Sequence, residues 1–146
     1  MSQRATQFTV VAAPPAVLFH VVTDFEHYLD WVSELKKIEV MARDDEGRAT
    51  DVEFRAAAFG RSTTYVLHYD YSAAPGALTW HQSAGDLTSV LNGGYRFDEV
   101  EGGTRVTYEL EVELLVPIPA FVRARAASRI QTQALRELKA RAEGLT

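Results

Sequence analysis

Hydrophobic and polar residues alternate with a period of two along much of the chain. The clearest run places Val106, Tyr108 and Leu110 on one side and Arg105 and Glu109 on the other. Because successive side chains of a strand point to opposite faces, this run predicts a strand with one dry and one solvated face. Further strands are predicted over residues 3–12, 34–43, 51–58, 65–71, 78–82 and 87–97. Turn-forming residues separate the strands at 44–47, 59–61, 74–76, 85–86 and 101–103.

Three segments have helical spacing instead. Pro15 suits the first turn of a helix, and the apolar residues that follow it predict a short helix over residues 15–22. Asp24 is expected to cap a second short helix that runs through Trp31. Residues 117–143 form one amphipathic stretch, which predicts a long C-terminal helix. Its predicted apolar stripe consists of Phe121, Ala124, Ala127, Ile130, Ala134, Leu138 and Ala142.

The order of these elements suggests how they pack. A meander of strands with one apolar face needs a cover, and only the last helix is long enough to supply it. At about 1.5 Å per residue that helix would reach about 40 Å, enough to cross a strongly bent sheet. Gly93 and Gly94, in the middle of the longest strand, mark the expected bend. A curved sheet closed over one helix encloses a space, which is the main clue to function.

Composition narrows the class of protein. A chain of 146 residues fits one domain, taken here as 1–146, that can bury a sizeable core. The absence of cysteine excludes disulfides and thiolate metal sites, and the cytoplasm is the simplest expected location. A net charge of -5 argues against a nucleic-acid partner, because such proteins owe much of their affinity to phosphate neutralisation. No run approaches the roughly 20 apolar residues of a membrane span.

Several segments resemble a known superfamily. They are residues 15–24 (PAVLFHVVTD), Tyr28 with Trp31, 91–95 (LNGGY) and 103–108 (GTRVTY). Together they resemble the START and pollen-allergen-type helix-grip superfamily, SRPBCC, and within it the polyketide cyclase/dehydrase-like and ubiquinone-binding-protein-like families. The resemblance spans nearly the whole chain. Relatives often have proline after the tyrosine of the second short helix, where this chain has Leu29.

The resemblance implies an α+β helix-grip fold. In this fold a curved antiparallel seven-stranded sheet wraps around a long C-terminal helix, and two short helices follow the first strand. It also implies a hydrophobic cavity between sheet and helix that holds a lipid, quinone, polyketide or similar molecule. The alternative is a fully packed core built from the same residues.

The predicted inner face mixes large aromatic residues with small ones, as a pocket with aromatic walls requires. Gln82 and Ser89 are the expected inward polar groups, placed to meet buried tyrosine hydroxyls or a ligand carbonyl. The candidate ligand-binding residues are Phe54, Ala56, Tyr65, Leu67, Tyr69, Trp80, Gln82, Ser89, Leu91, Tyr95, Phe97, Tyr108, Leu110, Phe121 and Ala124.

Candidates for catalysis are few. His68, His81 and Asp70 fall on the outward face of their strands by parity. His20 and His27 lie on the short helices near the expected cavity mouth, and His27 could form an acid/base pair with a neighbouring carboxylate. The partners considered for His27 are Asp24, Glu26 and Asp30. The histidines lack metal-ligand spacing, so no metal, cofactor or catalytic residue is assigned.

The sequence therefore favours a protein that binds a small hydrophobic ligand, for transport or sequestration, without converting it. One alternative is an enzyme of polyketide cyclase or dehydrase type that uses tyrosine hydroxyls, Gln82 and His27 for proton handling. A second is a protein that acts on ribosomes or a membrane surface through a basic stripe on the last helix. That stripe consists of Arg125, Arg129, Arg136 and Lys139. The oligomeric state is left open.

Overall fold

The computed structural model describes residues 3–58, 60–115 and 117–146. The strands are β1 (Gln3–Val11), β2 (Leu35–Arg43), β3 (Ala49–Ala58), β4 (Arg61–Asp70), β5 (Ala77–Gly85), β6 (Thr88–Val100) and β7 (Gly103–Leu114). The helices are α1 (Pro15–Thr23), the short 3-10 helix η1 (Phe25–Asp30), α2 (Ala120–Arg123) and α3 (Ala126–Gly144). The predicted α+β class and the two short helices after the first strand are confirmed.

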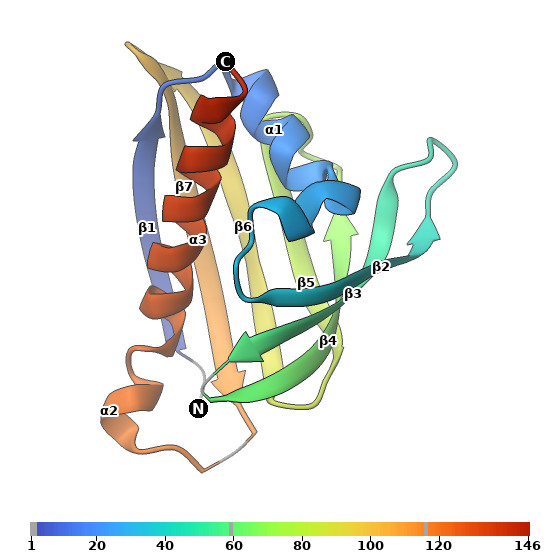
Figure 1. Ribbon diagram of the computed structural model, residues 1–146, viewed down its shortest axis with the longest axis vertical. Helices are drawn as coiled ribbons and strands as arrows, with labels where there is room; N and C mark the ends of the chain where they lie inside the picture. The colour runs from blue at the N-terminus through green and yellow to red at the C-terminus, as the bar shows by residue number, and fades with distance from the viewer. Residues whose placement is uncertain (1–2, 59, 116) are drawn as a thin grey trace.

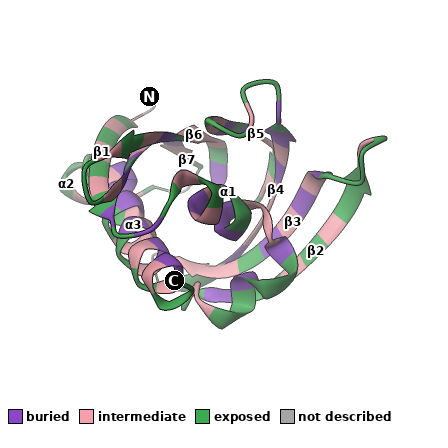
Figure 2. Cartoon of the chain, turned by 90° about the horizontal axis from the view of Figure 1, so that it is seen from above, coloured by how far each residue is buried: buried purple, intermediate pink, exposed green. Residues whose placement is uncertain are grey.

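The strands form one antiparallel sheet in the order β1-β7-β6-β5-β4-β3-β2. The first strand thus pairs with the last, and consecutive strands are neighbours elsewhere. The sheet curls strongly, and α1 and α3 lie on its concave side (Figure 2). The predicted helix-grip fold is confirmed by this arrangement.

Helix α3 covers only one side of the curled sheet. It runs along β1 and β7, while β2 and β3 curve away on the other side (Figure 1). Its buried face has helical spacing and consists of Ala126, Ala127, Gln131, Leu135, Leu138 and Ala142. Small residues on this face let the helix approach the sheet closely. A cavity can form between α3 and the strands that curve away from it.

Polar contacts fix α3 to the edge strand. The buried side-chain amide of Gln131 donates hydrogen bonds to the carbonyl oxygens of Ala5 and Tyr108, each at 2.8 Å. The Lys139 ammonium donates to the carbonyl oxygen of Val10 at 2.6 Å and pairs with Glu143 at 3.0 Å. These bonds occupy carbonyl groups along β1, so the helix also covers an edge that would otherwise be open to pairing.

The prediction of one continuous helix over residues 117–143 is wrong. The segment folds as the short α2 and the 19-residue α3, with a break at Ala124 and Arg125. The physical reason is packing, because a helix in water is stabilised mainly by the apolar face that it buries. Strand β7 ends at Leu114, and Phe121 before the break has no sheet to cover and is 71% exposed.

The short helices α1 and η1 pack inside the curled sheet, and α1 lies toward the end away from α2 (Figure 1). Leu18 and Val22 of α1 are fully buried, and the hydroxyl of Tyr28 in η1 donates to the carbonyl oxygen of Val22. Asp24 makes no side-chain capping bond to the backbone of η1, contrary to expectation, because its carboxylate accepts from His27 instead. Phe59, in the turn predicted at 59–61, lies outside the described residues.

Candidate ligand-binding site

A cavity of about 540 Å³ lies between the concave face of the sheet and α3. Its walls come from strands β2 to β7, from η1 and the connection that follows it, from the loops after β3 and β5, and from one face of α3. The lining residues are Tyr28, Trp31, Val32, Glu34, Leu35, Phe54, Ala56, Ala57, Ala58, Gly60, Thr63, Tyr65, Leu67, Tyr69, Trp80, Leu87, Thr88, Leu91, Tyr95, Tyr108, Leu110, Arg129, Ile130, Gln133 and Glu137. This volume falls within the range of about 300–1,000 Å³ that is usual for small-molecule pockets.

Aromatic rings form the floor and sides of the cavity. Trp80 is central, with its ring centroid 5.3 Å from that of Tyr95, 5.7 Å from Tyr108 and 5.8 Å from Tyr69. On β3 and β4, Phe54 and Tyr65 stack with their centroids 5.3 Å apart. Contacts of this kind hold the rings in fixed orientations. The cavity therefore has rigid, flat and largely apolar walls.

Four tyrosine hydroxyls in these walls are available to a ligand. The buried hydroxyls of Tyr28 and Tyr71 donate to main-chain carbonyl oxygens. By contrast, no described residue hydrogen-bonds to the hydroxyl groups of the four other cavity-lining tyrosines, namely Tyr65, Tyr69, Tyr95 and Tyr108. A buried hydroxyl normally has a partner, so these groups can donate to acceptor atoms of a molecule in the cavity.

Burial keeps these hydroxyls protonated. It raises the pKa of Tyr65 to about 12, and the nearby Glu34 carboxylate adds to the effect. Burial also raises the pKa of Tyr69, Tyr95 and Tyr108 well above the ordinary tyrosine value, and neighbouring tyrosines contribute. All four groups are therefore neutral hydrogen-bond donors at physiological pH.

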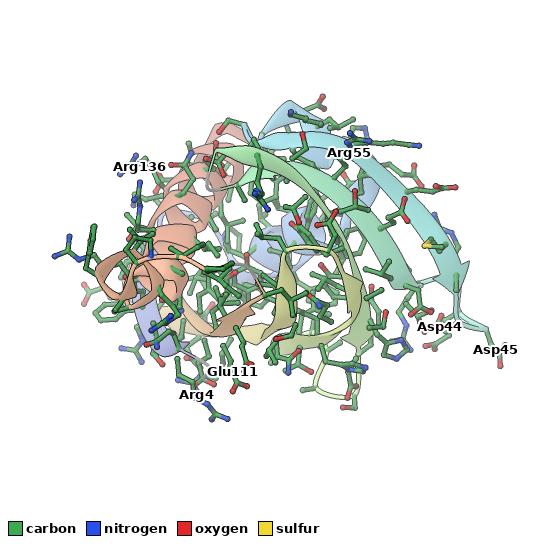
Figure 3. The ribbon with its side chains drawn as sticks, turned by 90° about the horizontal axis from the view of Figure 1, so that it is seen from below. Arg4, Asp44, Asp45, Arg55, Glu111 and Arg136 are labelled. Atoms are coloured by element: carbon green, nitrogen blue, oxygen red, sulfur yellow. The ribbon has the colours of Figure 1, made fainter. Side chains whose placement is uncertain are left out.

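The charged residues of the cavity lie at its mouth. Arg129, Glu34 and Glu137 are the charged lining residues, and none of them is on a described strand. On one side the mouth is bridged by Ser33, whose amide donates to Glu137 at 3.1 Å and whose hydroxyl accepts from Gln133 at 3.2 Å. The labelled charged residues Arg55, Glu111 and Arg136 lie on the outside of the shell (Figure 3). The interior thus suits an uncharged molecule.

The structure places ten of the candidate ligand-binding residues on the cavity wall. They are Phe54, Ala56, Tyr65, Leu67, Tyr69, Trp80, Leu91, Tyr95, Tyr108 and Leu110. Their alternation along the strands was sufficient to place them, because the buried face of a strand recurs every second residue.

Gln82 and Ser89 do not reach the cavity, because both lie beside irregular strand pairing. The backbone ladder between β5 and β6 ends at Trp80 and Gly93, and the Gln82 side chain instead bonds to Thr88. Ser89 is the extra residue of a bulge in β6, which turns it outward and brings Thr88 to the wall.

Phe97, Phe121 and Ala124 were also misplaced by the sequence prediction. Phe97 is buried beneath α1, where its ring meets that of Phe19 edge-on at 6.5 Å, away from the cavity. Phe121 and Ala124 are exposed because the last helix breaks before it reaches the sheet. They do not roof the cavity, and Ile130 of α3 lines it instead.

Sequence reasoning missed several wall residues. Tyr28, Trp31 and Val32 come from η1 and the connection that follows it, and Leu87 comes from the loop between β5 and β6. Residues in such connections follow no hydrophobic period, so a sequence pattern does not show which of them face the cavity. Thr88 was missed because an unrecognised bulge reverses strand parity.

The histidines lie outside the cavity. His27 Nδ1 is 2.8 and 2.9 Å from the two carboxylate oxygens of Asp24, in a separate hollow that also contains His20. That carboxylate raises the pKa of His27. On the outer face of the sheet, His68 bonds to Asp51 at 2.9 Å and lies beside His81. The proposed role of His27 in proton handling within the cavity is therefore not supported by its position.

A comparison with protein families identifies the chain. The model of the family described as polyketide cyclase / dehydrase and lipid transport matches residues 2–143. The chain belongs to this family. The predicted resemblance to polyketide cyclase/dehydrase-like proteins is thereby confirmed. No curated protein matched the chain.

Solved structures extend the likeness of this polyketide cyclase/dehydrase family member to the whole fold. A START superfamily protein from Mycobacterium smegmatis has a TM-score of 0.90 at 23% identity, covering 98% of this chain and 99% of that one. The Zhui aromatase/cyclase from Streptomyces sp. R1128 has a TM-score of 0.84 at 16% identity, covering 98% and 94%. A protein from Thermus thermophilus has a TM-score of 0.74 at 21% identity, covering 100% and 99%. At these identities the likeness shows the fold.

Among the described residues of this family member, no helix is both long and apolar enough to cross a membrane. Likewise, no cluster of three or more histidine, aspartate or glutamate side chains in the described part of the chain is arranged to hold a metal ion.

Proposed function

We propose that the protein binds a small, largely apolar and uncharged ligand that carries acceptor oxygens, in the cavity beneath α3. The observation that carries this proposal is the set of tyrosine hydroxyls without partners among the described residues, in a wall formed mainly by apolar and aromatic side chains. The volume of about 540 Å³ and the flat aromatic sides favour a molecule built on fused or linked rings. Quinones, oxygenated lipids and polyketides have these properties.

A bulky residue placed on the wall tests this proposal. Ala56 lines the cavity, whereas Ala140 is exposed on α3. Titration with the fluorescent probe N-phenyl-1-naphthylamine should give saturable binding to the wild-type protein. Ala56→Trp should weaken that binding at least about tenfold, whereas Ala140→Trp should leave it unchanged. Equal binding by both variants, with melting temperatures near wild type, would refute the cavity as the site.

The natural ligand can be sought directly. Native mass spectrometry of the protein purified from its own host would detect a retained molecule by its added mass. A molecule that leaves on Ala56→Trp substitution would support the proposal. An uncharged ring compound is expected, and a highly charged one would contradict it.

Cyclase or dehydrase activity is the second candidate, and the family description favours it. Glu34 and Tyr65 both line the cavity, and the Glu34 carboxylate adds to the effect of burial in raising the pKa of the Tyr65 hydroxyl, so these two groups are the candidates for moving a proton. Turnover of an aromatic polyketone that survives both Glu34→Gln and Tyr65→Phe would remove this assignment.

A single domain over residues 1–146 and a location in the cytoplasm stay predictions of the sequence.

A further inference from the structure

The segment between β7 and the cavity mouth exposes apolar side chains. Phe121 is 71% exposed and Leu115 is 57% exposed. Pro117 and Pro119, which lie between Leu115 and Phe121 in the sequence, are also exposed. Helix α2 projects from one end of the molecule (Figure 1). We call the described residues 115 and 117–129 the α2 segment. Phe121 and Leu115 thus place two large exposed apolar side chains on one short segment, as interaction surfaces often do.

The α2 segment is also basic. No aspartate or glutamate occurs between Glu113 and Glu137 in a chain whose net charge is -5. The same stretch contains Arg123, Arg125, Arg129 and Arg136, and none of these guanidinium groups forms an ion pair with a described residue. Arg123, Arg125 and Arg129 lie within the α2 segment, which thus combines cationic and apolar groups, whereas the protein as a whole is acidic.

Both ends of the α2 segment border the cavity. The Leu115 amide donates to the carbonyl oxygen of Leu87 at 2.8 Å, and the Leu87 side chain lines the cavity. At the other end Arg129 itself lines the cavity mouth. A surface that holds the α2 segment would therefore lie next to the opening through which an apolar molecule enters or leaves.

We propose that the α2 segment docks on membranes that contain anionic phospholipids. Phe121 and Leu115 enter the interfacial region of the bilayer, and the arginines meet the lipid phosphates. Aromatic and basic side chains on a projecting segment suit this boundary, since the ring can enter it while the guanidinium groups remain at the headgroups. Docking presents the cavity mouth to the bilayer, yet it does not depend on the ligand proposal, because it needs no occupied cavity.

Vesicle co-sedimentation tests the docking. The protein should sediment with vesicles of equal parts phosphatidylglycerol and phosphatidylcholine at about 50 mM salt. Binding should fall at least about tenfold with phosphatidylcholine alone or at about 500 mM salt. Phe121→Ser and the double variant Arg123→Gln/Arg125→Gln should each weaken binding at least about fivefold.

A matched control comes from β1. Phe8 is 66% exposed on that strand, close to the exposure of Phe121. Phe8→Ser should therefore leave vesicle binding unchanged, and both serine variants should keep the wild-type melting temperature. Equal loss of binding by the two variants would overturn the assignment to the α2 segment. No sedimentation of the wild-type protein would overturn the docking itself.

Two further outcomes would distinguish membrane docking from other roles of the α2 segment. If the double arginine variant loses vesicle binding and Phe121→Ser does not, the contact is purely ionic and the proposed insertion of Phe121 into the bilayer is wrong. If light scattering shows that wild type self-associates and Phe121→Ser does not, the patch is an interface between copies and the membrane proposal is again wrong. Binding of N-phenyl-1-naphthylamine by Phe121→Ser in vesicle-free buffer keeps a failure of docking distinct from a failure of ligand binding.

Discussion

The indole ring of Trp80 lies over Gly93, its cross-strand neighbour on β6. A Cβ atom at position 93 would lie 3.0 Å from Cζ2 of Trp80 and would also collide with the carbonyl oxygen of Glu109. Gly93 therefore makes room for the ring that contacts Tyr69, Tyr95 and Tyr108. The role of Gly93 is to let the Trp80 ring and the β7 backbone approach β6 closely.

Gly93→Ala should accordingly disturb the cavity floor. The added methyl group meets backbone that cannot move independently, so the free energy of unfolding should fall by about 1–3 kcal/mol. Urea unfolding followed by tryptophan fluorescence measures this change. Gly144→Ala is the matched control, because a Cβ there meets open space. A neutral Gly93→Ala would show that the ring has more freedom than this contact implies.

Removing a cavity hydroxyl should affect binding more than stability. The Tyr108 hydroxyl has no partner among the described residues, so Tyr108→Phe should change the free energy of unfolding by less than about 0.5 kcal/mol. Affinity for 2-methyl-1,4-naphthoquinone, measured by quenching of tryptophan fluorescence, should fall about threefold to tenfold. Affinity for 2-methylnaphthalene, which lacks acceptors, should stay the same.

The opposite pattern is expected at Tyr71. Its hydroxyl donates to the carbonyl oxygen of Ala49 at 2.7 Å, and Tyr71 does not line the cavity. Tyr71→Phe should lower the free energy of unfolding by about 0.5–1.5 kcal/mol and leave affinity for the naphthoquinone unchanged. Identical effects of the Tyr71 and Tyr108 substitutions on both measurements would contradict the distinction drawn between their hydroxyls.

Gln131 should be important for the position of α3. Gln131→Leu keeps the volume but removes the donor shared by the carbonyl oxygens of Ala5 and Tyr108. The free energy of unfolding should fall by about 1–3 kcal/mol, the usual cost of leaving buried polar groups unpaired. Gln133→Leu, at a partly exposed position two residues later, should cost much less. Chemical denaturation measures the free energy of unfolding of both variants, and equal losses would contradict the special role of Gln131.

Stability should decline at alkaline pH. Tyrosines of the unfolded chain release their protons near about pH 10. Burial raises the pKa of Tyr65 to about 12, and it raises the pKa of Tyr69 and Tyr108 as well. As pH rises from the unfolded value toward the folded one, only the unfolded chain loses protons, so the free energy of unfolding decreases.

Urea unfolding at about pH 8 and about pH 10.5 measures this decline. Tyr69→Phe should make it shallower, because one group that titrates only in the unfolded chain is removed. An equally steep decline in that variant would mean that the pKa of Tyr69 is not raised by folding.

Local patterns predicted much of the cavity wall. Strand parity placed Tyr65, Tyr69 and Tyr95 on the inner face, since a regular strand buries every second side chain. Parity failed at Ser89, where a bulge adds a residue whose presence depends on pairing with β7. It failed at Gln82 as well, where the side chain replaces missing backbone pairing with β6.

The sequence by itself determined the order of strands and helices, the apolar inner face and the basic character of the C-terminal region. These properties follow from periodicity and charge, which each segment carries alone. Tertiary structure decided where the last helix begins, because a helix persists only where it can bury its apolar face. That outcome moved Phe121 from the expected cavity roof to the surface, and irregular pairing of β6 kept Gln82 and Ser89 from the cavity wall.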